Sequence, residues 1–273
     1  MNRTDRALYL LPIVMLFAAA CGRIEANDGP RRGDKSVTIT RNWPAAGISD
    51  LRVAEVDGSV SVEASETNEI SLVATAQGDL DIKAGQENDG LFITKVEGNT
   101  LSIGRRDQKH TPFVFNVRRL FGRGGKRINY ALRVPPTVSL EVNTVNGRIV
   151  SRGMSGATDA ATVNGSIDIE TAGTHELQAT SVNGPVRAKF LQSFQGAQFR
   201  TVNGGVEAIL PQSASFNVNL SQVNGDFEAS FPLSIHTNPG SRRVSGEVNG
   251  GEHQLKITTV NGDVQLARLN GSL

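Results

Sequence analysis

Acidic side chains recur at the outward positions of the second half of the chain, and they are the first candidates for chemistry. They are Asp168, Glu170, Glu207, Asp226, Glu228 and Asp263. If the elements that carry them stack in register, such carboxylates can line one wall and bind calcium or serve as acid and base on a polysaccharide. Arg148, Arg187 and Gln265 fall at equivalent places and interrupt this acidic stripe. We therefore favour the competing interpretation, in which these residues only face solvent.

The four histidines lack the spacing of a metal site. His110, His175, His236 and His253 each stand alone in their segments, without a second ligand on the same element. The calcium-binding nonapeptide and the Gly-x-Ser-x-Gly nucleophile elbow are both absent from the sequence. The sequence therefore predicts no catalytic residue, no metal and no cofactor.

A strongly basic stretch with three phenylalanines lies near the middle of the chain. From Arg105 to Arg133 it holds nine basic side chains against one acidic side chain, Asp107. One interpretation is a solvated loop between two strands. The sharper hypothesis is contact with anionic envelope components, such as lipid head groups or acidic glycans, with the aromatic rings as anchors. The residues assigned to that contact are Arg118, Arg119, Arg123, Lys126 and Arg127.

The N-terminus predicts export. Arg3 and Arg6 precede an apolar run, residues 7–20, that ends in small residues and is interrupted by Pro12. This run is shorter than the roughly 20 residues that a membrane-spanning helix needs. Residues 1–20 therefore read as a signal peptide.

Cys21 is the only cysteine in the chain. Phe17-Ala18-Ala19-Ala20-Cys21 resembles the lipobox of bacterial lipoproteins, which implies that Cys21 is lipidated and anchors the protein to a membrane. The aspartate that signals inner-membrane retention in many such lipoproteins does not follow it, so the resemblance implies the outer membrane. The alternative is an ordinary secretory signal that leaves Cys21 as a free thiol. Residues 21–35 predict a flexible tether.

A sequence repeat predicts the elements that position these side chains. Val-Asn-Gly occurs seven times, and its first five copies are 18, 19, 20 and 21 residues apart. Apolar residues stand at the second and usually the fourth place after each glycine, so each copy opens a strand with one dry face and one wet face. Asn-Gly is expected to supply the positive φ angles of a tight corner. The predicted corner residues are Asn146, Gly147, Asn164, Gly165, Asn183, Gly184, Asn203, Gly204, Asn224, Gly225, Asn261 and Gly262.

Two all-β architectures fit this repeat. One is a single-stranded β-solenoid with coils of about 18–21 residues, and the other is an antiparallel meander or sandwich built from Asn-Gly hairpins. The valine before each asparagine favours the solenoid. A hairpin would expose this valine beside charged residues, whereas at a solenoid corner we expect it to turn inward while the asparagine side chains stack into a hydrogen-bonded ladder.

The chain divides into an N-terminal β region with degenerate repeats, residues 36–140, and a regular solenoid, residues 141–273. The basic loop, residues 105–133, belongs to the first part. The last two copies of the repeat break the period, with gaps of 25 and 12 residues. This irregularity predicts a displaced corner at Val244-Ser245-Gly246 and a local turn at Val248-Asn249-Gly250.

The run from Tyr130 to Gly147, the regular Val-Asn-Gly copies and the ending Thr259-Val260-Asn261-Gly262-Asp263-Val264 resemble the bacterial "putative adhesin" family. That family is a domain of unknown function related to the auto-transporter adhesin head (GIN) domains. The resemblance implies a β-solenoid in an exported or envelope-anchored protein, and it offers no catalytic residue.

We therefore expect a non-enzymatic, lipid-anchored envelope protein that acts as an adhesion, scaffolding or binding surface, with an envelope glycan or another envelope protein as its partner. One alternative is a β-helix that binds or degrades polysaccharide, and a second is an accessory to envelope stress or signalling. The formal charge of +1 excludes a general affinity for nucleic acid.

Overall fold

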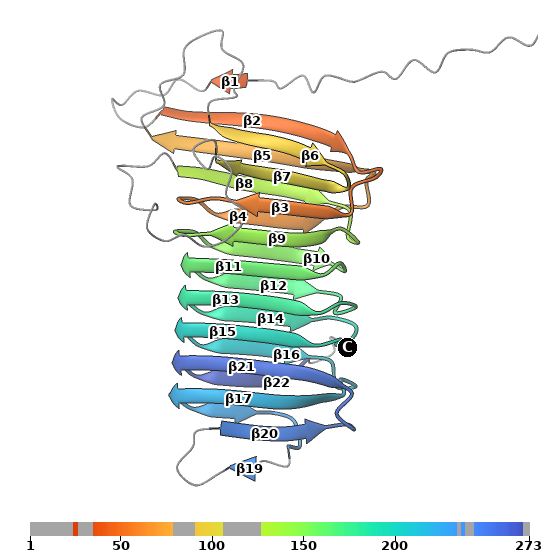
Figure 1. The fold of residues 1–273 in the computed structure, drawn as a ribbon, viewed down its shortest axis with the longest axis vertical. Helices are drawn as coiled ribbons and strands as arrows, with labels where there is room; N and C mark the ends of the chain where they lie inside the picture. Colours follow the sequence, from red (N-terminus) through yellow and green to blue (C-terminus); the bar gives the residue numbers. More distant parts are fainter. Residues whose placement is uncertain are drawn as a thin grey trace, which may run out of the picture.

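The computed structural model describes residues 24–26, 35–78, 91–105, 127–233, 236–237 and 243–269, and these residues form two eleven-stranded sheets (Figure 1). We call them sheet A and sheet B and give both from the N-terminal end of the stack. Sheet A consists of β1 (Ile24–Ala26), β2 (Lys35–Pro44), β5 (Glu69–Gly78), β8 (Arg127–Val134), β4 (Val60–Ala64), β10 (Ile149–Met154), β12 (Ile167–Thr171), β14 (Val186–Phe190), β16 (Val206–Leu210), β22 (Val264–Arg268) and β18 (Phe227–Ala229). Sheet B consists of β6 (Phe92–Glu97), β7 (Thr100–Arg105), β3 (Asp50–Ala54), β9 (Ser139–Thr144), β11 (Thr158–Asn164), β13 (Leu177–Asn183), β15 (Ala197–Asn203), β21 (His253–Asn261), β17 (Phe216–Asn224), β20 (Arg243–Val248) and β19 (His236–Thr237).

The middle of the stack is a regular solenoid. Each coil is one strand of sheet B followed by one strand of sheet A, and each strand pairs in parallel with its equivalent in the next coil. In sheet A, Ile149 lies opposite Ile167, and Ile167 lies opposite Val186. The predicted all-β solenoid is confirmed, and the hairpin meander is wrong because its strands would be antiparallel.

The core lies between the two sheets. Ile167 and Ile169 of β12, with Leu177 and Ala179 of β13, are at most 1% exposed. Each buried aliphatic side chain of this size contributes about 1.5–3 kcal/mol. Because the alternate residues stay in water, a slip of one residue would exchange the two faces, and the period of two therefore fixes the register of every coil.

The coils do not stack in chain order. The coil β21–β22, which follows every other described strand in sequence, lies between β15–β16 and β17–β18. At the other end, β3–β4 lies between β7–β8 and β9–β10 in the same way. The two sheets therefore continue across residue 140 without a break.

The irregular copies of the repeat belong to one end of this arrangement. β20 runs antiparallel to β17, so Val244-Ser245-Gly246 lies inside a strand and the predicted displaced corner is wrong. The predicted local turn is confirmed, since Asn249 and Gly250 have φ angles of 49° and 93° and the Gly251 N–H donates to the Val248 carbonyl at 3.1 Å. The prediction failed because the 25-residue and 12-residue gaps together are about as long as two coils, whereas part of that length forms the antiparallel strand β20.

Antiparallel strands cover both ends of the stack. β2 pairs with β5, β5 pairs with β8, and β6 pairs with β7 at the N-terminal end. β20 and β19 extend sheet B at the opposite end. The described residues include no helix with the length and hydropathy needed to cross a membrane.

Candidate functional site

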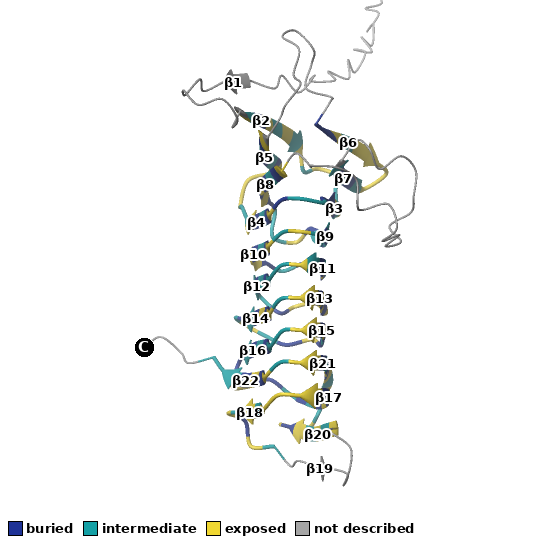
Figure 2. Cartoon of the chain, turned by 90° about the vertical axis from the view of Figure 1, so that its left-hand side faces the viewer, coloured by how far each residue is buried: buried dark blue, intermediate teal, exposed yellow. Residues whose placement is uncertain are grey.

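The Asn-Gly corners form a ladder of amides along one edge of the stack, which faces the viewer in Figure 2. The Asn164 Nδ2 donates to Asn146 Oδ1 at 2.8 Å, and the Asn183 Nδ2 donates to Asn164 Oδ1 at 2.8 Å. The same contact continues through Asn203, Asn261 and Asn224. All the donors point the same way, and the series ends where Asn146 donates to the carboxylate of Asp57 at 2.7 Å. Asp57 fits this last place because an ionised carboxylate only accepts.

The corner glycines are required by close stacking. A Cβ on Gly165 would lie 2.0 Å from the carbonyl oxygen of Gly147, and one on Gly204 would lie 2.1 Å from that of Gly184. The expected positive φ at the corner asparagines is wrong, since Asn249 is the only non-glycine with positive φ among the described residues. Gly147, Gly165 and Gly204 also lack it. The backbones of successive corners approach so closely that no side chain fits.

A second ladder, which the sequence analysis missed, lies inside the corner. The Thr162 hydroxyl donates to the Gly147 carbonyl at 3.1 Å, and the Ser181 hydroxyl donates to the Gly165 carbonyl at 3.1 Å. Thr144, Thr201 and Thr259 make the same contact, and the amide of Gln222 replaces the hydroxyl in the remaining coil. The signal was a Ser or Thr two residues before the asparagine in five of these six coils.

The valine before each corner asparagine points outward, so the expectation that it turns inward is wrong. In β13, Leu177, Ala179 and Ser181 are buried, while Val182 is 37% exposed. The strand keeps its alternation up to the asparagine, and the hydroxyl residue takes the inward place. The solenoid is correct, but the argument from valine that favoured it is not. We call these side chains the valine column; in stack order they are Val145, Val163, Val182, Val202, Val260 and Val223.

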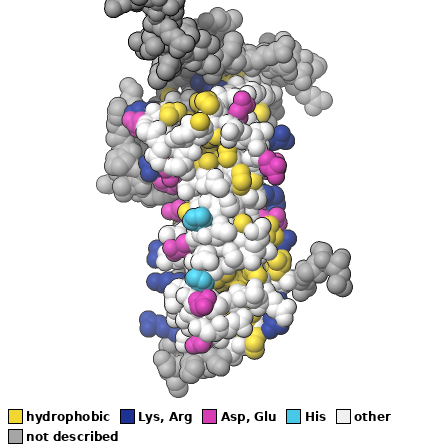
Figure 3. Space-filling model, turned by 90° about the vertical axis from the view of Figure 1, so that its right-hand side faces the viewer, with side chains coloured by type: hydrophobic (Ala, Val, Ile, Leu, Met, Phe, Trp, Pro, Cys, Tyr) yellow, Lys and Arg dark blue, Asp and Glu magenta, His cyan; other side chains and the backbone are white. Residues whose placement is uncertain are grey.

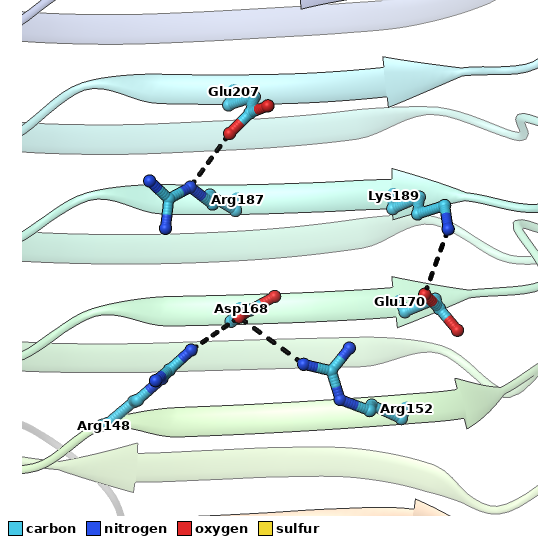
Figure 4. Close-up of polar contacts among 7 residues, drawn as sticks. All are labelled: Arg148, Arg152, Asp168, Glu170, Arg187, Lys189 and Glu207. Atoms are coloured by element: carbon cyan, nitrogen blue, oxygen red, sulfur yellow. Dashed lines mark hydrogen bonds and ion pairs between the residues drawn. The ribbon is translucent and has the colours of Figure 1, made fainter. Parts of the chain in front are cut away.

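The outer face of sheet A carries the predicted acidic candidates, and three of them lie in ion pairs with cations of neighbouring strands (Figure 4). The pairs are Arg148 and Arg152 with Asp168 at 2.7 and 3.7 Å, Lys189 with Glu170 at 3.4 Å, and Arg187 with Glu207 at 2.9 Å. Asp226 and Asp263 lie on neighbouring strands, where the Asp226 N–H donates to Asp263 Oδ1 at 2.9 Å. Across the described part of the chain, no three His, Cys, Asp or Glu side chains converge as a metal site would require.

The outer face of sheet B holds a shallow groove of about 210 Å³ near its N-terminal half. Asp50, Glu141, Asp159 and Glu176 line it, and Arg52 Nε lies 2.9 Å from Glu141 Oε2. Partial burial, and then the negative charge of Glu141, raise the pKa of Asp159 above its ordinary value of 3.8. The groove therefore contains two neighbouring carboxyl groups, and its environment disfavours the charged form of Asp159 relative to an exposed aspartate.

His175 and His253 have structural contacts, and Figure 3 shows separate histidine patches on the edge opposite the asparagine ladder. The His175 Nδ1 lies 2.7 Å from the carbonyl oxygen of Ser155. The ring of His253 packs edge-on against Phe194, with centroids 6.3 Å apart. Of the predicted contact residues, Arg127 begins β8 and is exposed. The remaining calls, which are residues 1–20, Cys21, Arg118, Arg119, Arg123 and Lys126, lie outside the described residues.

The fold and its corners define an internally repeated, two-sheeted β-solenoid. A model of the Toastrack DUF4097 family matches residues 32–267, so the chain belongs to that family. No curated protein matches the chain.

The solved structures that match this chain include the following three. A "putative cell adhesion protein" from Clostridium sporogenes is 9% identical, with 86% of this chain and 100% of that chain covered and a TM-score of 0.47. A "putative adhesin" from Bacteroides fragilis is 13% identical, with 85% and 97% covered and a TM-score of 0.42. A "putative lipid binding protein" from Parabacteroides distasonis is 12% identical, with 85% and 97% covered and a TM-score of 0.33.

Proposed function

We propose that this chain is a non-enzymatic, lipid-anchored protein of the cell envelope that provides an adhesion, scaffolding or binding surface. The observation that carries the proposal is the in-register repetition of the outer faces. Strands about 4.8 Å apart place the corner asparagines and the valine column in register, so an extended partner meets these groups at a constant interval. The asparagine ladder is the most regular of these arrays, and each of its amides keeps a second N–H directed away from the ladder.

The pairing of charges on sheet A supports a surface role. Asp168, Glu170 and Glu207 are each held by a cation on an adjacent strand, which orders the face without assembling an acid and a base around one substrate atom. The face is thus rigid, polar and electrically balanced.

A glycan array probed with the purified protein tests the binding role. We expect retention of at least one class of envelope glycan, with the bound glycan recovered unchanged after long incubation. The proposal would be contradicted if the protein bound neither glycans nor isolated envelope fractions. Release of new reducing ends from the glycan would show that the protein is an enzyme.

The membrane anchor rests on the sequence around Cys21. Replacing Cys21 with Ser is expected to move the protein from the membrane fraction to the soluble fraction and to abolish metabolic labelling with a fatty acid. Because the chain has a single cysteine, the label has one thiol to report on. Equal membrane retention of the variant would contradict lipidation.

The basic stretch is proposed as a contact with anionic envelope components. Reversing Arg118, Arg119, Arg123 and Arg127 to Glu is expected to reduce binding to vesicles of anionic lipid, and the loss should shrink as salt screens the wild-type contact. A control reversal of Arg148 and Arg187, whose partners lie on sheet A, should leave vesicle binding unchanged. Unchanged, salt-insensitive binding by the first variant would remove this assignment.

One observation favours a second candidate function, a polysaccharide-active protein. In the groove on sheet B, Asp159, whose pKa is raised by burial and then by the charge of Glu141, lies beside that second carboxyl group, and glycoside hydrolysis uses a pair of carboxyl groups. This candidate predicts release of reducing sugar that Asp159→Asn abolishes. An Asp159→Asn variant with unaltered glycan handling would leave only the surface role.

A further inference from the structure

The two outer faces of the solenoid treat their charges differently. On sheet A, cations and carboxylates alternate between strands and pair within the chain. Between β9 and β21 of sheet B they are segregated along the stack. Glu141 and Asp159 lie on β9 and β11, whereas Arg200 and Lys256 lie on β15 and β21.

Figure 3 shows sheet B edge-on at its left margin, where acidic and basic side chains are mixed in the upper part and basic side chains predominate in the lower part. Within the described part of the chain, no ion pair joins Asp159, Arg200 or Lys256 to another side chain. Glu141 itself pairs with Arg52 of β3 at 2.9 Å, so the described charges of this face that are open to a second molecule include Asp159 at one end and Arg200 and Lys256 further along the stack.

The same face exposes an apolar line. Val182, Val202, Val260 and Val223 of the valine column are 37%, 41%, 37% and 53% exposed. The register places them directly opposite one another on successive strands, because the residues on either side of them pair. Six valines on strands about 4.8 Å apart make a line of roughly 24 Å. An apolar line of this kind, bordered by polar side chains, is a common mark of a protein contact.

We propose that the outer face of sheet B is the interface of a symmetric homodimer, in which two copies of this chain pack face to face with their stacks running in opposite directions. The two-fold axis runs parallel to the strands and passes over β13. A two-fold interface must be complementary to itself, and this axis makes it so.

The axis aligns the apolar groups first. β13 meets β13, β11 meets β15, β9 meets β21 and β3 meets β17, because the stack order around β13 is symmetric in number. Residues at the same height along the strands then face one another. Val182 meets its own copy, Val163 meets Val202, and Val145 meets Val260.

The charges follow the same rule. Glu141 and Lys256 occupy the same place along β9 and β21, as the register through Asp159, Gln178 and Gln198 shows. They therefore face each other across the interface. Asp159 lies opposite Gln198 of the other copy, and Arg200 is the next outward residue of that strand, two residues further along. Arg200 supplies a positive charge near Asp159. Within the single chain, burial and the charge of Glu141 raise the pKa of Asp159 instead.

The area is sufficient for a stable pair. Seven strands at about 4.8 Å, each about seven residues long at about 3.3 Å per residue, give a face of roughly 800 Å² per copy. That is about the size of a standard protein interface. On sheet A, by contrast, Asp168, Glu170 and Glu207 are already paired with cations of the same chain.

Sedimentation equilibrium of the purified protein tests the proposal. We expect a dimer for the wild type and a monomer for Val182→Glu, which places two carboxylates together on the axis and weakens association by about a hundredfold or more. Val73→Glu is the matched control: Val73 is 39% exposed on the outer face of sheet A, so this variant should remain a dimer. A monomeric wild type, or an equal effect of both substitutions, overturns the proposal.

A charge exchange tests the predicted orientation. Asp159→Lys and Arg200→Glu should each weaken the dimer about tenfold, and the double variant should recover most of that loss because the pair is restored with reversed signs. Circular dichroism confirms that each variant keeps its β-structure. If the effects of the two substitutions simply add, the antiparallel arrangement is wrong.

Discussion

At each solenoid corner, four consecutive residues have four separate tasks. In Thr201-Val202-Asn203-Gly204, the hydroxyl donates to the glycine carbonyl of the neighbouring coil and the valine faces solvent. The asparagine extends the amide ladder, and the glycine leaves room for the next backbone. The repeated order of these residue types along the chain therefore reflects the close spacing between coils rather than the bend of a single turn.

Gly165→Ala tests the close approach of corner backbones. Gly165 lacks positive φ, so only the clash of the new Cβ with the Gly147 carbonyl oxygen, 2.0 Å away, opposes the change. We expect a loss of unfolding free energy at the upper end of the roughly 1–3 kcal/mol that overpacking costs, measured by urea denaturation. Gly104→Ala is the control, because its Cβ would lie 3.7 Å from the nearest atom. Equal costs for the two variants would contradict the stacking argument.

The direction of the amide ladder can be tested by replacing one side-chain NH2 group with oxygen. Asn183→Asp removes the donor to Asn164 and places two acceptor oxygens together, so we expect a loss of more than about 1 kcal/mol at neutral pH. Asp57→Asn at the end of the ladder should cost less, because an amide still accepts from Asn146. Thermal denaturation measures both. A larger effect at Asp57 would mean that the ladder is not polarised.

The raised pKa of Asp159 makes a statement about pH. Ionisation of this carboxyl is penalised in the folded chain, so the penalty is absent below pH 3.8 and grows as the pH rises through the raised pKa. In the monomeric Val182→Glu background, Asp159→Asn should therefore raise the melting temperature at neutral pH and have no effect near pH 3. A gain that is the same at both pH values would exclude this electrostatic cause.

At the scale of the elements, the repeat predicts each coil but not its place. The period, the alternation of dry and wet positions and the asparagine ladder all follow from local sequence. The insertion of β21–β22 does not, because every coil offers the same register and the same dry face. Ile257 pairs with Phe199 on one side and Leu220 on the other, and the sequence around Phe199 and Leu220 would also allow them to pair directly. The predicted direction of the valines failed for a different reason: the strand alternation continues closer to the corner than the argument assumed.

Ile257→Ala tests whether the inserted coil is a full part of the core. Ile257 is fully buried between two coils, although it lies near the end of the sequence. We expect a loss of about 2–5 kcal/mol, equal to that of Ile167→Ala in the middle of the stack. Urea denaturation with a single transition would measure it. A small loss at Ile257 alone would indicate that β21–β22 separates before the rest unfolds.

At the scale of the whole molecule, the solenoid ends in strands that run against the stack. An exposed edge of parallel strands is a template for further pairing, and β20 covers such an edge on β17. The stack therefore has an asparagine edge and antiparallel strands at the N-terminal end of both sheets and at the opposite end of sheet B, where β20 and β19 lie. Its described surface favours contacts along its length over contacts at its tips.

A proline pair tests the role of β20. Substituting Val244 and Ser245 together with Pro removes N–H donors at both alternating positions of the strand, so β20 should detach from β17. We expect concentration-dependent aggregation, followed by light scattering. Glu66→Pro, in an exposed turn between β4 and β5, is the control and should not aggregate. A double variant that stays as dispersed as the control would show that β17 needs no cover.

The insertion of β21–β22 also determines the order in which this end of the chain can fold. Asn261 binds Asn203 across a separation of 58 residues, and β17 finds its parallel neighbour only when residues later than 252 exist. Before residues 253–268 are added, this end of the chain thus lacks the coil that lies between β15–β16 and β17–β18. Closure of such a long-range contact is slow compared with the addition of a neighbouring coil. The middle coils can therefore form one after another, but the end of the stack that contains β17 and β18 reaches its native structure only after β21 and β22 are present.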